Sequence, residues 1–196
     1  MSKSFNNVYT FKDLKDCNPL AIKLELLVPW YRTQINFTVK GIHEKQKMIS
    51  KANNFIRRVA KASGPKNSEI KKVCDKFLTN LESALDDDLN TPLAFAEFHK
   101  FQSNINKFLD DNSVSKEDAQ HILFVLKKFD DVFSFLDFEQ KETELPKQFL
   151  DKIKQREHLR KQGRYCEADK IRQELNQKGI ILQDNKDFTT SWELKI

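Results

Sequence analysis

The chain has 196 residues, of which 39% are hydrophobic and 32% are charged. This composition is typical of a globular protein with a genuine core and excludes a largely disordered chain. No apolar run approaches the roughly 20 residues that a membrane span needs, and no apolar stretch follows Lys3 as in a secretory leader. Three widely spaced cysteines without a CxxC pair predict reduced thiols, so we expect a cytoplasmic protein.

The net charge of +5 is unevenly distributed along the sequence. Residues 146–196 contain 12 Lys or Arg against 8 Asp or Glu, whereas residues 1–145 contain 22 against 21. An excess of positive charge favours contact with a polyanion such as a nucleic acid. An ordinary basic surface that contacts only solvent is the alternative interpretation.

The first region, residues 1–63, predicts two helices. Apolar side chains at helical spacing favour a helix over 13–30 that restarts at Pro19, because proline suits the first turn of a helix. Thr38 is the expected N-cap of a longer helix that reaches Val59. We expect these helices to connect the N-terminal segment to the next region.

Residues 64–137 predict three further helices. Ser68 is the expected cap of the first of them, and Thr91 is the expected cap of the second, with proline at its first position. Ser115, followed three residues later by Asp118, resembles a capping box for the third. Short connections between amphipathic helices favour antiparallel packing, so we expect a mainly α fold built on a helical bundle.

Residues 138–196 begin with a polar linker, which extends over 137–144, and predict a small, basic α+β module. We expect, in order, a helix to about Lys161, a break at Gly163, a helix over 165–178 that stops at Gly179, and strands over 180–182 and 189–194 around a turn at 184–187. Trp192 is the expected core residue of this hairpin.

Four blocks of the sequence, in the same order, resemble the class I aminoacyl-tRNA synthetases and the cysteinyl-tRNA synthetases in particular. Ser2-Lys3-Ser4 resembles the KMSKS signature of that family, entered one residue inside it. Residues 30–38 carry its Tyr-Arg-x-x-apolar-Asn-aromatic-Thr pattern, and residues 86–92 and 168–184 resemble two further blocks. The resemblance implies a helical bundle of the anticodon-binding type, followed by a small domain that reads the anticodon of tRNA(Cys).

The resemblance also implies roles for individual residues. Lys3, with Ser2 and Ser4, would contact ATP phosphate and stabilise the charge that develops during adenylate formation. Tyr165 would stack on an anticodon base, and Asp169, one helical turn later, would accept hydrogen bonds from a base edge. The cations expected to contact tRNA phosphates are Arg160, Lys161, Arg164 and Arg172.

Other interpretations of these residues stay open at this point. Each cation also fits an ordinary solvated surface, and Tyr165 also fits a packed position against Ile171 or Trp192. Three adjacent aspartates at 86–88 could hold a metal ion, although helix capping explains them more simply.

The sequence departs from the family in several places. Phe5-Asn6-Asn7 stands where the family has Leu-Gly-Asn, and Pro29-Trp30 stands where a small residue and His commonly precede the Tyr-Arg pair. The first lysine of the signature, the HxGH-type motif, the nucleotide-binding fold and the zinc ligands all lie upstream in the family. We therefore expect no complete catalytic site and no metal site in this chain.

These observations predict a tRNA-binding C-terminal portion of an enzyme that joins cysteine to tRNA(Cys), converting ATP to AMP and diphosphate. The chain alone is expected to be inactive and monomeric, to bind tRNA(Cys), and to meet ATP and cysteine only beside a catalytic domain. One alternative is a free-standing, non-catalytic tRNA-binding or regulatory protein from a truncated gene. A helical interaction scaffold without a nucleic-acid partner is the third hypothesis.

Overall fold

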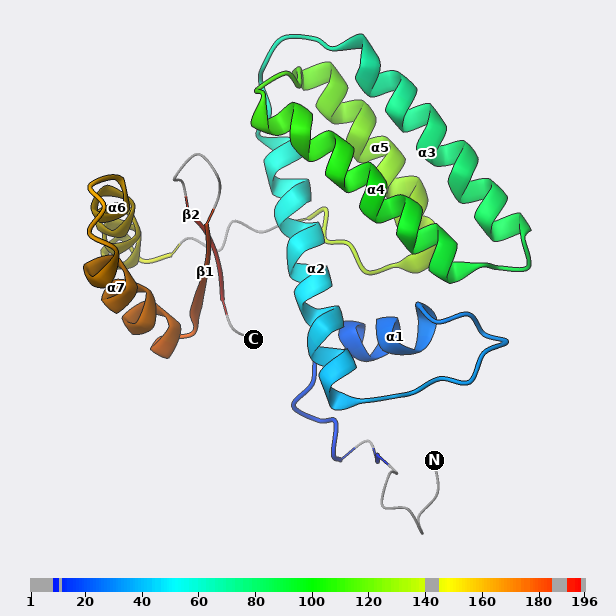
Figure 1. The fold of residues 1–196 in the computed structure, drawn as a ribbon, viewed down its shortest axis with the longest axis horizontal. Helices are drawn as coiled ribbons and strands as arrows, with labels where there is room; N and C mark the ends of the chain where they lie inside the picture. Colours follow the sequence, from blue (N-terminus) through cyan, green and yellow to red (C-terminus); the bar gives the residue numbers. More distant parts are fainter. Residues whose placement is uncertain (1–8, 11, 140–144, 185–189, 195–196) are drawn as a thin grey trace. The chain divides into compact units, whose positions relative to one another are not determined.

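The computed structural model describes residues 9–10, 12–139, 145–184 and 190–194 (Figure 1). It divides the chain into two compact units, unit 1 (Met1–Asp137) and unit 2 (Phe138–Ile196). Unit 1 contains α1 (Pro19–Leu27), α2 (Val39–Ala60), α3 (Ser68–Asp86), α4 (Thr91–Asp110) and α5 (Lys116–Phe133). Unit 2 contains α6 (Lys147–Lys161), α7 (Tyr165–Gln177), β1 (Ile180–Asp184) and β2 (Thr190–Leu194). The predicted mainly α fold is confirmed.

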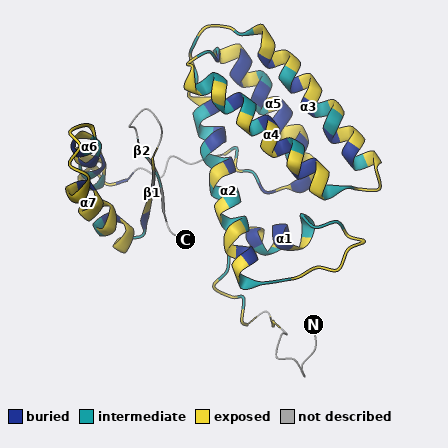
Figure 2. Cartoon of the chain, in the orientation of Figure 1, coloured by how far each residue is buried: buried dark blue, intermediate teal, exposed yellow. Residues whose placement is uncertain are grey.

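In unit 1, α3 packs against α4 and α5, while α2 packs against α4 and α5 and also carries α1 (Figure 1). The buried faces of these helices turn toward one another (Figure 2). Phenylalanine rings fill the centre: Phe77 stacks on Phe101 at 4.5 Å, and Phe98 stacks on Phe129 at 4.6 Å. Since aromatic side chains bury more apolar area than any others, they are the main source of the core's stability.

Gly41 of α2 leaves space for a buried carboxylate of α1. A Cβ atom at this position would lie only 1.8 Å from Oε1 of Glu25, which is buried on α1. Glu25 pairs with Lys45 at 3.3 Å, so the carboxylate is held in place beside the glycine. Glycine therefore leaves room for the Glu25 carboxylate, which a Cβ at this position would displace.

Two predicted helix starts are confirmed. Thr38 Oγ1 accepts a hydrogen bond from the Gly41 N–H at 2.9 Å and caps α2. Ser115 and Asp118 form a capping box at the start of α5, with both reciprocal bonds present. Each of these contacts joins residues three apart, which is why the sequence alone was sufficient to predict them.

Two other predicted caps are wrong by one residue. Asn67 caps α3 and Asn90 caps α4, each through a side-chain oxygen that accepts a backbone N–H of the first turn, at 3.0 and 3.2 Å. Ser68 and Thr91 are therefore the first helical residues instead of the caps. Asparagine fills the cap position as well as serine does, so the residue type did not decide the boundary.

The first predicted helix is shorter than expected. It was expected over 13–30, but α1 begins only at Pro19. Asn18 has extended backbone angles (φ −64°, ψ 123°), as favoured before a proline, and a helix cannot continue through it. Before it, Asp13 accepts hydrogen bonds from the N–H and hydroxyl of Thr10, both at 2.7 Å, which stabilises a turn in place of a helix.

Unit 2 has a core of its own, under a two-stranded antiparallel sheet. Leu182 lies opposite Trp192, and Asp184 lies opposite Thr190. The core consists of Leu145, Ile153, Leu175, Ile180 and Leu182, with Phe149, Ile171 and Trp192 packed against it. Asp184, expected in the turn, instead belongs to β1, whereas the predicted turn residues 185–187 and Thr189 lie outside the described residues.

Candidate nucleic-acid interface

A tight turn between α6 and α7 fixes the position at which α7 begins. The Gly163 N–H donates to the Arg160 carbonyl at 3.0 Å, and the Arg164 N–H donates to the Leu159 carbonyl at 2.9 Å. These two bonds make a Schellman motif, which requires a left-handed residue between the helices. Gly163 supplies it with a φ of +75°. Tyr165 is consequently the first residue of α7.

Tyr165 and Asp169 lie one turn apart on α7, so they share one face of the helix. Tyr165 is 57% exposed and Asp169 is exposed, whereas Ala168 between them is buried against the rest of unit 2. The alternative of a packed Tyr165 is therefore wrong, because Ile171 and Trp192 join the core without it. The ring and the carboxylate are both open to a ligand.

An ion pair with one buried partner joins Arg156 of α6 to Asp184 of β1 in unit 2. Arg156 is 1% exposed, and its two terminal nitrogens donate to the two carboxylate oxygens of Asp184 at 2.6 and 3.0 Å. This bidentate geometry is the strongest form of an arginine–carboxylate contact. The Arg156 guanidinium holds the pKa of the Asp184 carboxyl below its ordinary value, against the effect of partial burial. Arg160 and Arg172 lower it further.

Arg160 and Arg172, two of the predicted phosphate-binding cations, converge on the same carboxylate. Arg160 Nη1 lies 3.0 Å from Asp184 Oδ1, and Arg172 Nη1 lies 3.9 Å from Oδ2. Glu157 is the second acid of this group and accepts the Thr190 N–H at 2.6 Å. Three guanidinium groups therefore face the single carboxylate of Asp184, which leaves an excess of positive charge where β1 ends.

The other two predicted cations lie near the turn between α6 and α7. Arg164 donates to both oxygens of Glu167, at 2.7 and 2.6 Å, and both side chains are about half exposed. Such an exposed pair is screened by water and contributes little, so a phosphate could replace the carboxylate. Lys161 is exposed and makes no ion pair with any residue that the structure describes.

The structure gives no account of the predicted ATP contacts, because Ser2, Lys3 and Ser4 lie outside the described residues. Among the residues that are described, no three His, Cys, Asp or Glu side chains come together as a metal site would require. None of the described helices is long and apolar enough to cross a membrane.

Two of the four resembling blocks meet in unit 1. The Tyr31 hydroxyl donates to Asp88 Oδ1 at 2.7 Å, Arg32 pairs with Oδ2 of the same carboxylate at 2.5 Å, and the Trp30 indole N–H donates to the Asp88 carbonyl at 3.1 Å. Asp88 and Leu89 both have left-handed φ angles, of 53° and 52°. Contacts from residues 30–32 thus hold a strained turn between α3 and α4.

This contact also explains the run of aspartates better than a metal does. The Tyr31 hydrogen bond lowers the pKa of Asp88, and Arg32 adds to the effect. Asp87 accepts a hydrogen bond from the Asn90 side chain at 3.0 Å. The carboxylates are therefore used separately, in a clamp and in the turn before α4.

Comparisons with known proteins agree with this arrangement. A family model described as the DALR domain matches residues 80–137, which run from the second half of α3 to the end of unit 1. The cysteine–tRNA ligase of Chlamydia trachomatis serovar A is 35% identical over 201 residues, which cover 95% of this chain and 42% of that protein. The chain is related to the cysteine–tRNA ligases. The corresponding ligase of Protochlamydia amoebophila is 29% identical, covering 96% of this chain and 40% of the relative.

The chain spans about two-fifths of the length of the curated relatives that it matches. The ligase of Leptospira interrogans, also 29% identical, shows the same proportion, with 95% of this chain and 41% of the relative covered. The match extends over both units, and the resemblance of the four blocks to cysteinyl-tRNA synthetases is confirmed.

Sequence reasoning missed the roles of Arg156 and Asp184 in unit 2. Asp184 ends the last resembling block, but its partner lies 28 residues earlier in the chain. A usable signal was present, since Arg156 and Arg160 are four residues apart and so lie on one face of α6. The carboxylate that gathers them became visible only once β1 was placed beside that face.

Proposed function

We propose that this chain binds tRNA(Cys) and that unit 2 contacts the anticodon. The observation that supports this most directly is the exposed pair of Tyr165 and Asp169 on one face of α7. Proteins recognise unpaired RNA bases by stacking them on aromatic rings and by hydrogen bonds to their edges. An exposed tyrosine with an exposed carboxylate one turn away offers both contacts to a single-stranded loop.

The surrounding cations suit the phosphates next to that loop. Lys161 and Arg164 lie at the turn before Tyr165, where they would contact the backbone on one side of a stacked base. Arg160 and Arg172 are held by Asp184, and their excess positive charge would attract RNA without requiring the ion pairs to break. Asp184 would act as a positioning residue for these two guanidinium groups.

We also propose that the chain belongs to an enzyme that attaches cysteine to tRNA(Cys), with conversion of ATP to AMP and diphosphate, in the cytoplasm. In that enzyme Lys3, with Ser2 and Ser4, would contact ATP phosphate, and a zinc ion would be held by residues outside this chain. By itself the chain would be a monomer and inactive. Exchange of radioactive diphosphate into ATP, with cysteine present, tests this: the chain alone should give none, and measurable exchange would contradict the proposal.

Binding to two RNAs tests the anticodon contact. Wild-type tRNA(Cys) and the same tRNA with a substituted anticodon differ only in the bases that unit 2 would contact. We expect the substituted tRNA to bind at least tenfold more weakly, because each lost base contact costs about 1–3 kcal/mol. Equal affinity for both RNAs would remove the anticodon assignment. Failure to bind any tRNA at low salt would instead favour a helical interaction scaffold.

A further inference from the structure

Positive charge in unit 1 is concentrated on α2. The charge balance counted over residues 1–145 does not show this concentration. α2 contains six Lys or Arg and one acid, Glu44, a net charge of +5 on a single helix. α3, α4 and α5 together contain 8 Lys or Arg against 10 Asp or Glu. The near-neutral balance of residues 1–145 therefore results from one strongly basic helix beside three slightly acidic ones.

The cations of α2 differ in whether they already form an ion pair within unit 1. Arg58 pairs with Asp110 at 2.6 Å, and Lys45 pairs with the buried Glu25 at 3.3 Å. Lys40, Lys47 and Lys51 are exposed and make no ion pair with the residues that the structure describes. At 100° per residue these three lysines lie within about 40° of one another around the helix, and they span about 16 Å along it. They form one stripe.

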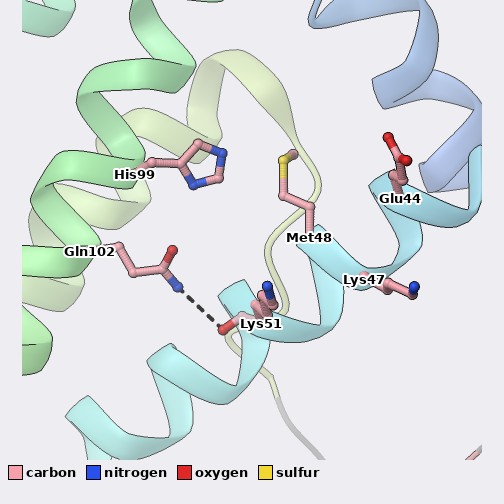
Figure 3. Close-up of a pocket in the computed structure, with 6 residues that line it drawn as sticks. All are labelled: Glu44, Lys47, Met48, Lys51, His99 and Gln102. Carbon is pink, nitrogen blue, oxygen red and sulfur yellow. Dashed lines mark hydrogen bonds between the residues drawn. The ribbon is translucent and has the colours of Figure 1, made fainter. Parts of the chain in front are cut away.

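A groove lies between α2 and α4, and two lysines of the stripe, Lys47 and Lys51, are among the residues that line it. It has a volume of about 410 Å³ and is lined by Glu44, Lys47, Met48, Lys51, His99 and Gln102. His99 and Gln102 project from α4 toward α2, where the imidazole ring faces Met48 (Figure 3). Gln102 Nε2 donates to the Lys51 carbonyl at 3.3 Å and so joins the two helices at one end of the groove. In the same view Lys47 points outward from α2, away from α4.

The electrostatic state of His99 indicates which ligand this groove favours. Partial burial lowers the pKa of the His99 imidazole, and the positive charges of Lys51 and Lys45 lower it further, against a hydrogen bond with Gln102. Glu44 is the one acid that lines the groove. The ring therefore lies in a positive potential that an anion would relieve.

We propose that the α2 lysine stripe (Lys40, Lys47 and Lys51), together with His99 across the groove, is a second RNA contact that holds the phosphodiester backbone without reading sequence. This inference rests on the proposed function, because it assigns unit 1 a part in binding the same RNA. Lysine ammonium groups are suited to phosphate as mobile point charges, and the His99 imidazole adds a donor that becomes charged when phosphate approaches.

Charge removal tests the stripe in the full chain. Lys47→Gln with Lys51→Gln should weaken tRNA(Cys) binding about tenfold at moderate salt, and should lower the slope of log affinity against log salt by about 1.5 to 2. The matched control is Lys71→Gln with Lys76→Gln, which removes two exposed charges from α3 in the same unit. If both double variants behave alike, the stripe is not an RNA contact.

The two proposals fail in different ways. Loss of the Lys47 and Lys51 charges should weaken wild-type and anticodon-substituted tRNA(Cys) by the same factor. If the anticodon matters but the stripe does not, only this inference is wrong. If the stripe matters but the anticodon does not, the anticodon assignment is wrong and the backbone contact stands.

Inorganic phosphate provides an independent probe of the groove. The pKa of His99, followed by NMR of its ring in wild-type protein, should rise when phosphate replaces chloride at equal ionic strength. An unchanged pKa overturns the anion site. The His99 pKa could rise with phosphate or AMP while tRNA binding is unchanged in the Lys47→Gln, Lys51→Gln variant. That combination would mean that the groove binds a small phosphate ligand, and it would overturn the assignment to an RNA backbone.

Discussion

At the scale of single residues, the Arg156–Asp184 pair stabilises unit 2, and its carboxylate also holds Arg160 and Arg172. Arg156 is almost fully buried, so loss of the Asp184 charge would leave a buried guanidinium without the counter-charge that it pairs with. Asp184→Asn should therefore destabilise unit 2 by about 3 kcal/mol. Urea unfolding followed by Trp192 fluorescence, in a Trp30→Phe background, measures it. Asp169→Asn is the matched control, because that carboxylate is exposed, and its unfolding curve should not change.

The same pair gives unit 2 a defined response to acid. Arg156 lowers the pKa of Asp184 in the folded chain below the ordinary value of 3.8. The stabilisation is therefore fully present above about pH 4 and is lost as the pH falls through the lowered, folded-state pKa. Trp192 fluorescence during acid titration should show unit 2 weakening in this range. Asp184→Asn should be less stable at neutral pH but less sensitive to acid, and an unchanged acid dependence would contradict this account.

Tyr165 is the residue with which binding and stability can be separated. Because its ring is 57% exposed, Tyr165→Ala should leave the unfolding of unit 2 nearly unchanged. The same substitution should weaken tRNA(Cys) binding by about 1–3 kcal/mol if a base stacks on the ring. Tyr165→Phe retains the ring and should retain most of the affinity. Equal losses in both variants would point to the hydroxyl and exclude stacking as the main contribution.

At the scale of elements, the α6–α7 turn couples backbone conformation to the site. Nothing lies within 4 Å of a Cβ placed on Gly163, so only its φ of +75° opposes a side chain. Gly163→Ala should destabilise unit 2 by about 1–2 kcal/mol, and Gly163→Asn should cost less, because asparagine tolerates left-handed angles better. Urea unfolding of both variants separates the effect of the backbone angle from an effect of packing. If packing were responsible, the larger asparagine would lower the free energy of unfolding more than alanine does.

Helix starts show what local sequence can determine. Thr38 and the Ser115–Asp118 box were predictable because each cap acts on a backbone group three residues away. Asn67 and Asn90 were missed because a neighbouring Ser or Thr offered an equally good cap, and only the observed backbone angles decide between them. Local chemistry therefore indicates that a helix begins, and leaves its first residue uncertain by one position.

The contacts that organise the candidate sites depend on long-range packing, so spacing in the sequence did not reveal them. Asp88 is reached by Tyr31 and Arg32 across 57 and 56 residues, and Asp184 is reached by Arg156 across 28. The resemblance to the synthetases supplied Tyr165 and Asp169 as candidates, and their spacing of four predicted that they share one helix face. The exposure of Tyr165 and the carboxylate that gathers the arginines could be read only from the fold.

At the scale of the whole molecule, each unit carries one strongly basic helix. α6 in unit 2 has six Lys or Arg against two acids, and α2 in unit 1 has six against one. Counted by region, the excess positive charge lies in residues 146–196. In residues 1–145 the negative charges of the other helices offset the positive charge of α2. Once the helices are separated in space, the cancellation no longer holds at the surface of α2.

The most direct test of the central claim is an anticodon transplant. The cysteine anticodon is placed in a tRNA that normally carries another amino acid, and its affinity for the full chain is compared with that of its parent. We predict a gain of at least tenfold that Tyr165→Ala abolishes, because the transplanted bases provide the contacts of α7. An unchanged affinity in the transplanted tRNA would contradict anticodon recognition by unit 2.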